Sequence, residues 1–140
     1  MILRKISDVE MIDVGKPFGM PDGSMLIQWI FSNDIGDDRY HHNFAVRKYT
    51  LKLSDASAIP FHNHAYVQSL TVLSGRMKCE SPEGIVEAGP GDSVCFYENE
   101  PHRAVPIGDG AAEVLCIIDC PDKGENCFPV APKDIQTSNA

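Results

Sequence analysis

The stretch PFHNHAYVQSLTVLSG, residues 60–75, decides the fold of this chain. It ends in a run rich in Val, Leu and Thr that favours a β-strand and stops at a Ser-Gly pair. His62 and His64 are two residues apart, and Gln68 follows four residues after His64. Because side chains alternate across an extended chain, this even spacing places both imidazoles and the amide on one face of the segment.

Short apolar runs with a similar rhythm fill most of the chain. They are bounded by clusters of Gly, Pro, Asn and Asp, which favour turns. The rhythm is typical of an all-β sandwich or barrel, whereas helical periodicity is weak and residues 7–11 are the best helical candidate. The expected strands cover residues 25–31, 44–53, 66–73, 76–80, 85–88, 93–97 and 113–119.

The composition bounds the size and the partners of the protein. The chain has 140 residues, of which 43% are apolar, and this suits one compact domain with a real core. With 12 basic and 20 acidic residues, its formal net charge of −8 argues against nucleic acid or an anionic membrane as a partner. No stretch of about 18 consecutive apolar residues occurs, so no transmembrane helix is expected. The first ten residues lack the apolar run of a secretion signal, and we therefore expect a cytoplasmic protein.

The five cysteines are an odd number, and without a secretion signal this favours reduced thiols over disulfides. The last three follow the pattern C-x3-C-x6-C, which differs from the usual spacing of zinc ligands. We therefore expect Cys116 to be a small buried residue and Cys120 and Cys127 to lie in loops. Cys79 and Cys95 are expected in the core.

A third imidazole can join the first two. His102 follows the turn-forming residues Asn99-Glu100-Pro101, and this turn could deliver it from a neighbouring strand. Imidazole nitrogen is the commonest protein ligand for Zn, Fe, Ni and Cu and also binds Mn, and the Gln68 amide oxygen could complete the shell. Taken separately, the same residues also suit structural roles: a solvated histidine pair, a hydrogen-bonded Gln in a strand and a surface histidine.

Residues 60–106 resemble the two-part signature of the cupin family. The first part, H-x-H-x(3,4)-E-x6-G, is matched by His62, His64, Gln68 and Gly75, with Gln in place of the usual Glu. The second part, G-x5-P-x-G-x2-H-x3-N, is matched by Gly91 and His102 at the family spacing. It departs from the family at Tyr97, Asn99 and Pro106. The likeness to small single-domain cupins extends over about residues 29–119.

The resemblance implies an all-β double-stranded β-helix, or jelly-roll cupin barrel, with an N-terminal extension. One divalent transition metal ion (Zn, Fe, Ni, Mn or Cu) would lie in the barrel mouth, held by His62, His64, Gln68 and His102. The implied division is an N-terminal arm over 1–24, the cupin barrel over 25–122 and a C-terminal arm over 123–140. Small cupins commonly pair through sheet edges, so the expected partners are a second copy in a homodimer and a small-molecule ligand.

The Gln at position 68 bears on the chemistry. It brings no charge to the metal, so the ion would keep its full charge as a Lewis acid. This favours an enzyme that acts on a small organic anion or a sugar-derived substrate by isomerisation or a lyase reaction. Two alternatives stay open: a metal-dependent dioxygenase, and a small-molecule binding or sensing module without turnover.

Three further residues are candidates for substrate contact. Arg47 and Tyr49 share a face of the expected strand 44–53 with Leu51 and Leu53, which favour the core. Arg47 could bind a substrate carboxylate with both arms of its guanidinium, or it could instead pair with an acid at the rim. Phe96 is expected in the core beside the pocket.

Overall fold

The computed structural model describes residues 1–16, 19–32, 37–52 and 61–119, and almost all of the regular structure there is β-strand. The short 3-10 turn η1 (Ile6–Asp8) precedes the first strand, and the 3-10 turn η3 (Asp38–Tyr40) lies in a connection between two strands. The strands are β1 (Ile12–Asp13), β2 (Met25–Phe31), β3 (Phe44–Lys52), β4 (Gln68–Gly75), β5 (Met77–Ser81), β6 (Gly84–Ala88), β7 (Ser93–Phe96), β8 (Arg103–Pro106) and β9 (Ala111–Asp119).

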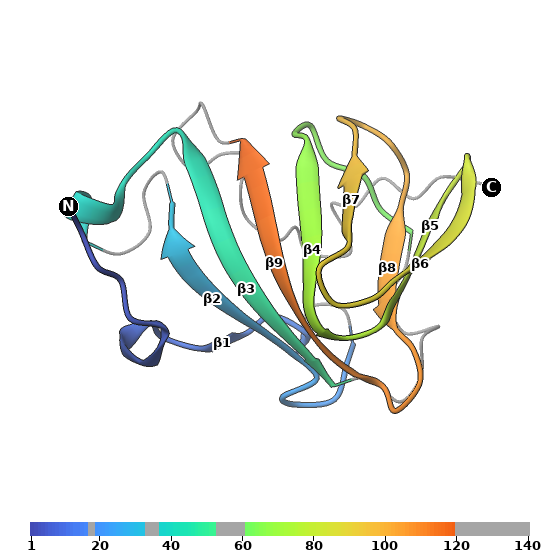
Figure 1. Cartoon of the computed structure of the whole chain (residues 1–140), viewed down its shortest axis with the longest axis horizontal. Coiled ribbons are helices and arrows are strands. Elements are labelled where there is room, and N and C mark those ends of the chain that lie inside the picture. The colour runs from blue at the N-terminus through green and yellow to red at the C-terminus, as the bar shows by residue number, and fades with distance from the viewer. Residues whose placement is uncertain (17–18, 33–36, 53–60, 120–140) are drawn as a thin grey trace.

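Two antiparallel sheets make up the fold (Figure 1). The larger has six strands in the order β1-β2-β3-β9-β4-β7, and the smaller has three in the order β6-β5-β8. The last described strand, β9, lies between β3 and β4 in the larger sheet. Strands that are far apart in the sequence are therefore neighbours, as in a jelly roll. The expected all-β jelly-roll fold is confirmed.

Alternating burial explains why these segments form strands. In β3, Ala45, Arg47, Tyr49 and Leu51 are buried, and their neighbours along the strand are more exposed. The paired strand β9 repeats the pattern, because its buried residues stand directly opposite those of β3. The core lies between the sheets, where the larger sheet meets β5 residues such as Met77. Period-two burial of this kind is what a strand with one buried face needs.

The expected strands agree with the observed ones to within two residues at each described end. Two short strands, β1 and β8, were not expected, since two residues and a run ending in Pro106 give little alternation to detect. The helical candidate at residues 7–11 is wrong: only the 3-10 turn η1 forms nearby. The predicted C-terminal arm over 123–140 lies outside the described residues, as do Leu53, Cys120 and Cys127.

The expectation for Cys95 is also wrong. Cys79 and Cys116 are buried, but Cys95 is exposed. On β7 the inward positions are Val94 and Phe96, which pair with Leu70 and Gln68 on β4, so the thiol between them faces outward. Among the described residues no helix is long and apolar enough to cross a membrane.

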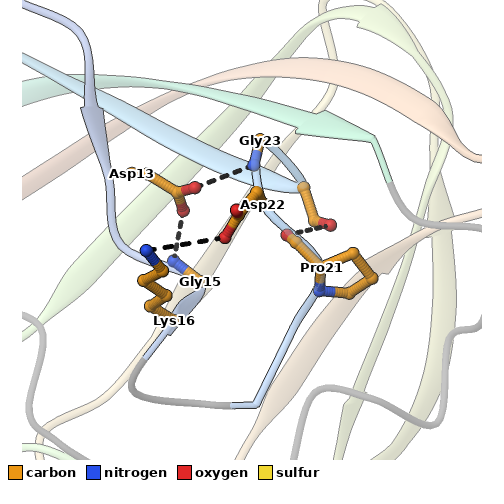
Figure 2. Close-up of polar contacts among 7 residues, drawn as sticks. Asp13, Gly15, Lys16, Pro21, Asp22 and Gly23 are labelled. Carbon is orange, nitrogen blue, oxygen red and sulfur yellow. Dashed lines mark hydrogen bonds and ion pairs between the residues drawn. The ribbon is translucent and has the colours of Figure 1, made fainter.

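The segment between β1 and β2 is organised around one carboxylate (Figure 2). The Asp13 side chain accepts hydrogen bonds from the backbone N–H groups of Gly15, at 3.0 Å, and Gly23, at 2.7 Å. These bonds lower the pKa of Asp13, with the Gly23 bond contributing most. The loop is therefore closed across its base, which allows β1 to pair with β2 at the edge of the larger sheet.

Gly75 at the end of β4 offers a test of the sheet packing. Its φ is 77°, and a Cβ there would collide with the Ala111 carbonyl oxygen and lie 2.9 Å from the Ala112 Cα. A left-handed backbone costs a non-glycine residue about 1–2 kcal/mol, and the clash adds to this. We expect Gly75→Ala to lower the free energy of unfolding by more than about 2 kcal/mol in urea titrations.

Gly91→Ala is the matched control, because Gly91 has φ of 90° but no atom within 4 Å of the added Cβ. Its free energy of unfolding should fall only by the cost of the left-handed backbone conformation. Equal losses in the two variants would contradict the close approach of β4 and β9 at Gly75.

Candidate metal centre

Two segments far apart in the sequence, residues 61–64 and 99–103, lie against each other. His62 and His102 form an isolated antiparallel bridge, in which each backbone N–H donates to the carbonyl oxygen of the other residue at 3.1 and 2.8 Å. On the adjoining positions, the Arg103 guanidinium lies 4.6 Å above the Phe61 ring. The bridge places the two imidazoles side by side, with ring centroids 4.7 Å apart.

His64 completes a cluster of three imidazoles, called the histidine cluster below (His62, His64 and His102). Its ring centroid lies 4.8 Å from that of His102 and 6.0 Å from that of His62. One nitrogen of each ring lies within 4.8 Å of those of the other two. Metal–nitrogen bonds are about 2.1 Å long, so small ring rotations would let one ion reach all three.

Backbone carbonyls determine which nitrogen of two of these rings is free. His64 Nδ1 lies 3.0 Å from the Tyr66 carbonyl oxygen, and His102 Nδ1 lies 2.7 Å from that of Glu100. A carbonyl can only accept, so both Nδ1 atoms carry the proton and both Nε2 atoms present a lone pair. Hydrogen bonds of this kind are what orient histidine ligands in metal sites.

Burial favours the neutral form of two members of the histidine cluster, His64 and His102. Burial lowers the pKa of His64 to about 4, and its hydrogen bonds only partly oppose the shift. Burial also lowers the pKa of His102 to about 3, and the neighbouring His62 adds to the effect. At neutral pH both rings are therefore uncharged, as a metal ligand must be.

The Nε2 lone pairs of His102 and His64 differ in their surroundings. His102 is 2% exposed, and its Nε2 has no hydrogen-bond partner. His64 Nε2 faces the Gln68 side-chain oxygen at 2.7 Å, so two acceptors stand against each other. A cation between them would relieve this arrangement, whereas in the metal-free protein the amide must turn its NH₂ group toward the ring. The residues present thus fit a divalent transition metal ion.

Aromatic rings enclose the cluster on two sides. Phe96 stacks on His102, with ring centroids 4.1 Å apart, and also lines a groove between β6 and β7. Tyr66 stacks on His64 at 3.9 Å. Sequence reasoning placed Phe96 in the core, where it lies, but did not single out Tyr66. The signal was present, because residue 66 continues the even spacing of 62, 64 and 68.

Arg47 and Tyr49 lie inside the barrel, and the alternative of a rim position for Arg47 is wrong. Arg47 is 2% exposed, and its guanidinium contacts the Tyr49 hydroxyl at 3.4 Å and the Cys116 sulfur at 2.8 Å. Burial disfavours its charge, but the Cys116 sulfur and the hydroxyls of Tyr49 and Tyr66 beside it favour the cation, so the pKa of Arg47 is raised and the guanidinium stays charged. Its charge also contributes to the low pKa of His64.

The low pKa values predict how stability depends on pH. The unfolded chain binds protons at histidine below pH 6.5, while His64 and His102 in the metal-free folded protein do not until about pH 4 and 3. Unfolding is therefore favoured as pH falls through this window. Between pH 7.5 and 5.5, we expect metal-stripped protein to lose about 2–3 kcal/mol of unfolding free energy in urea titrations.

This range of pH lies above the titration of carboxylates, so the histidines dominate the change. A His102→Gln variant should show a flatter dependence. If the wild type is equally stable at both pH values, the burial of neutral imidazoles described here is contradicted.

Comparison with known proteins supports the fold and the region of the site. The cupin domain family matches residues 51–118, and the sequence matches no curated protein. A similar solved structure is an RmlC-like cupin from Shewanella frigidimarina, with 18% identity and a TM-score of 0.61, covering 84% of this chain and 88% of that one. At this identity the likeness shows the fold alone.

Two further similar structures are enzymes. The polyketide cyclase RemF from Streptomyces resistomycificus has 21% identity and a TM-score of 0.67, covering 93% of this chain and 87% of that one. A sugar phosphate isomerase of the cupin superfamily from Silicibacter pomeroyi has 16% identity and a TM-score of 0.63, covering 84% and 75%. The family match itself includes both segments that meet at the His62–His102 bridge, so residues 51–118, which carry the histidine cluster, match the cupin domain family.

Proposed function

We propose that this protein holds one divalent transition metal ion through His62, His64 and His102, with the Gln68 amide oxygen as the fourth ligand. The ion would be Zn, Fe, Ni, Mn or Cu, all of which accept imidazole. The observation that carries the proposal is the buried His102 Nε2, whose lone pair has no hydrogen-bond donor, beside the His64 Nε2 lone pair, which faces the Gln68 side-chain oxygen. Unpaired buried acceptors of this kind are costly, so a cation is expected there.

We further propose that the protein is an enzyme acting on a small organic anion or a sugar-derived substrate by Lewis-acid chemistry, such as an isomerisation or a lyase reaction. None of the four donors is a carboxylate; His64 and His102 are uncharged at neutral pH, and Gln68 has no charge. When bound, the metal would supply polarisation of a substrate oxygen, undiminished by a ligand carboxylate.

The chain's own residues would position the reacting groups. The carbonyls of Tyr66 and Glu100 hold two imidazoles in the tautomer that points Nε2 at the site. The Phe96 and Tyr66 rings, stacked on those imidazoles, restrict their rotation and exclude water from their faces. A site held in this way needs little reorganisation during a reaction, and this is where electrostatic catalysis gains.

The names of similar enzymes favour a reaction without oxygen. Two of the similar structures are called a cyclase and an isomerase, and both names denote rearrangement of a substrate. Since one fold hosts many reactions, this is an analogy and supports only the class. The cytoplasmic location and the homodimer stay predictions from the sequence and the resemblance.

Metal content tests the site directly. Protein purified without chelator should contain about one transition metal ion per chain by elemental analysis, and a His62→Ala/His102→Ala double variant should contain almost none. His42→Ala is the matched control, because His42 stacks on Phe44 outside the histidine cluster. An equal metal load in the double variant would sink the assignment.

Turnover separates the classes of function. Metal-loaded protein is incubated with sugar phosphates, uronates and keto acids, and rearrangement is followed by NMR while dissolved oxygen is recorded. We expect product only with metal and without oxygen uptake. Oxygen consumption would identify a dioxygenase instead, and binding without product would identify a binding module.

The role of Gln68 is tested by Gln68→Glu. A carboxylate adds one negative charge at the ion, so we expect the metal to bind about tenfold tighter or more in chelator competition, and turnover to fall as the Lewis acid weakens. Ser69→Glu is the matched control, since it adds the same charge one residue along, on the opposite face of β4. If both variants bind metal like the wild type, Gln68 is not a ligand.

A further inference from the structure

The interior of the barrel is arranged in rows that cross the larger sheet. One row contains Ala45, Ile118, Gln68 and Phe96, as the strand register shows. The next row inward contains Trp29, Arg47, Cys116, Leu70 and Val94. Two residues of a strand span about 7 Å. Arg47 therefore lies one row deeper in the barrel than Gln68, the residue that touches the histidine cluster.

Hydrogen bonds connect these two rows. The Gln68 side chain contacts His64 Nε2 at 2.7 Å, and it also lies close enough to Cys116 to favour the ionised thiol. The Cys116 sulfur in turn lies 2.8 Å from the Arg47 guanidinium. The buried cation and the proposed metal ligands thus belong to one continuous polar network inside an otherwise apolar core.

Arg47 lacks the partner that a buried cation normally has. Its contacts include the Tyr49 hydroxyl, the Cys116 sulfur and the faces of the Trp29 and Tyr49 rings, at 5.2 and 5.5 Å, and the Tyr66 hydroxyl also interacts with it. Its Nε is buried without any partner. In the part of the chain that the structure describes, no carboxylate forms an ion pair with it.

A buried charge without a counter-charge costs several kcal/mol, so an anion that reaches Arg47 would be bound favourably. Burial raises the pKa values of Tyr49 and Cys116, so these neighbours stay neutral at pH 7 and do not supply the anion. The planar guanidinium has N–H groups left for a bidentate contact, which matches a carboxylate in shape and charge.

We propose that Arg47, with the Tyr49 hydroxyl beside it, forms an internal anion subsite that binds the carboxylate of a short hydroxy- or oxo-carboxylate, whose second oxygen points toward the histidine cluster. This rests on the proposed function, which it narrows from small organic anions to carboxylates with a second oxygen a few bonds away. Such a ligand would span the two rows, with its charged end at Arg47 and its other oxygen at the metal centre.

The test uses calorimetric titration of the zinc-loaded full chain with three probes: 3-hydroxypropionate, its neutral amide and propionate. We expect the hydroxy acid to bind at least about tenfold tighter than the amide, because the charge-assisted bonds to the guanidinium are lost in the amide. We also expect it to bind tighter than propionate, which has no second oxygen. A wild-type protein that binds the acid and the amide equally overturns the proposal.

Variants assign the preference to Arg47. Arg47→Met should abolish the preference for the acid, keep the zinc content, and leave the urea midpoint unchanged or raised, since an unpaired buried charge is removed. A purely structural arginine would give the reverse: lower stability and an intact preference. Lys48→Met is the matched control, because Lys48 is the next residue on β3 and its ammonium pairs with Glu113 on the other face. It should bind the acid like the wild type.

Two further experiments cover a variant that does not fold and distinguish the anion subsite from the metal centre. If Arg47→Met does not fold, Arg47→Lys replaces it, and this variant should weaken binding of the acid but not of the amide, since lysine keeps the charge and loses the planar fork. Equal affinity of the acid for Arg47→Lys and the wild type would overturn the subsite. Titration of metal-stripped protein, with the chelator dialysed away, distinguishes the two proposals. An Arg47-dependent preference for the acid that zinc does not strengthen would keep the subsite and refute the metal centre.

Discussion

The pairing of His62 with His102 is the interaction on which the site depends. Two reciprocal backbone hydrogen bonds join a segment before β4 to the start of β8, forty residues later in the chain. Closing so long a loop has an entropic cost, which the burial of the two sheets against each other offsets. Once the bridge forms, two imidazoles are neighbours without any further requirement, and His64 needs only the extended geometry of its own segment to join them.

The interior that this bridge closes is unusual in its electrostatics. In the histidine cluster the buried lone pair of His102 Nε2 has no donor, and one row deeper the Arg47 guanidinium has no carboxylate partner among the described residues. Both are unfavourable in an apolar core when left alone. The two groups are complementary, because the histidine lone pair would bind a cation and the Arg47 guanidinium would bind an anion. A metal ion with a carboxylate ligand would satisfy both, and the Gln68–Cys116 contact places the two requirements in one network.

Strands and ligand order could be read from the sequence because they are local properties. Alternation along residues 44–52 identified β3 and the shared inward face of Arg47 and Tyr49. The even spacing of His62, His64 and Gln68 identified one face of a segment. The prediction that Cys95 lies in the core failed, because the sequence of a short strand between turns does not show which of its faces is inward. Whether Arg47 paired at a rim or stayed unpaired depends on which residues lie across the barrel, and no local pattern reports this.

The sequence by itself determined that the chain is built of strands and that its histidines fall in the order of a cupin metal site, because period-two alternation and ligand spacing are both written in adjacent residues. Tertiary structure alone decided that His102 meets His62, that carbonyls of Tyr66 and Glu100 select the Nε2 lone pairs, and that Arg47 is buried beside Cys116. These relations join residues tens of positions apart, and they exist only after strand pairing has set the register across the barrel.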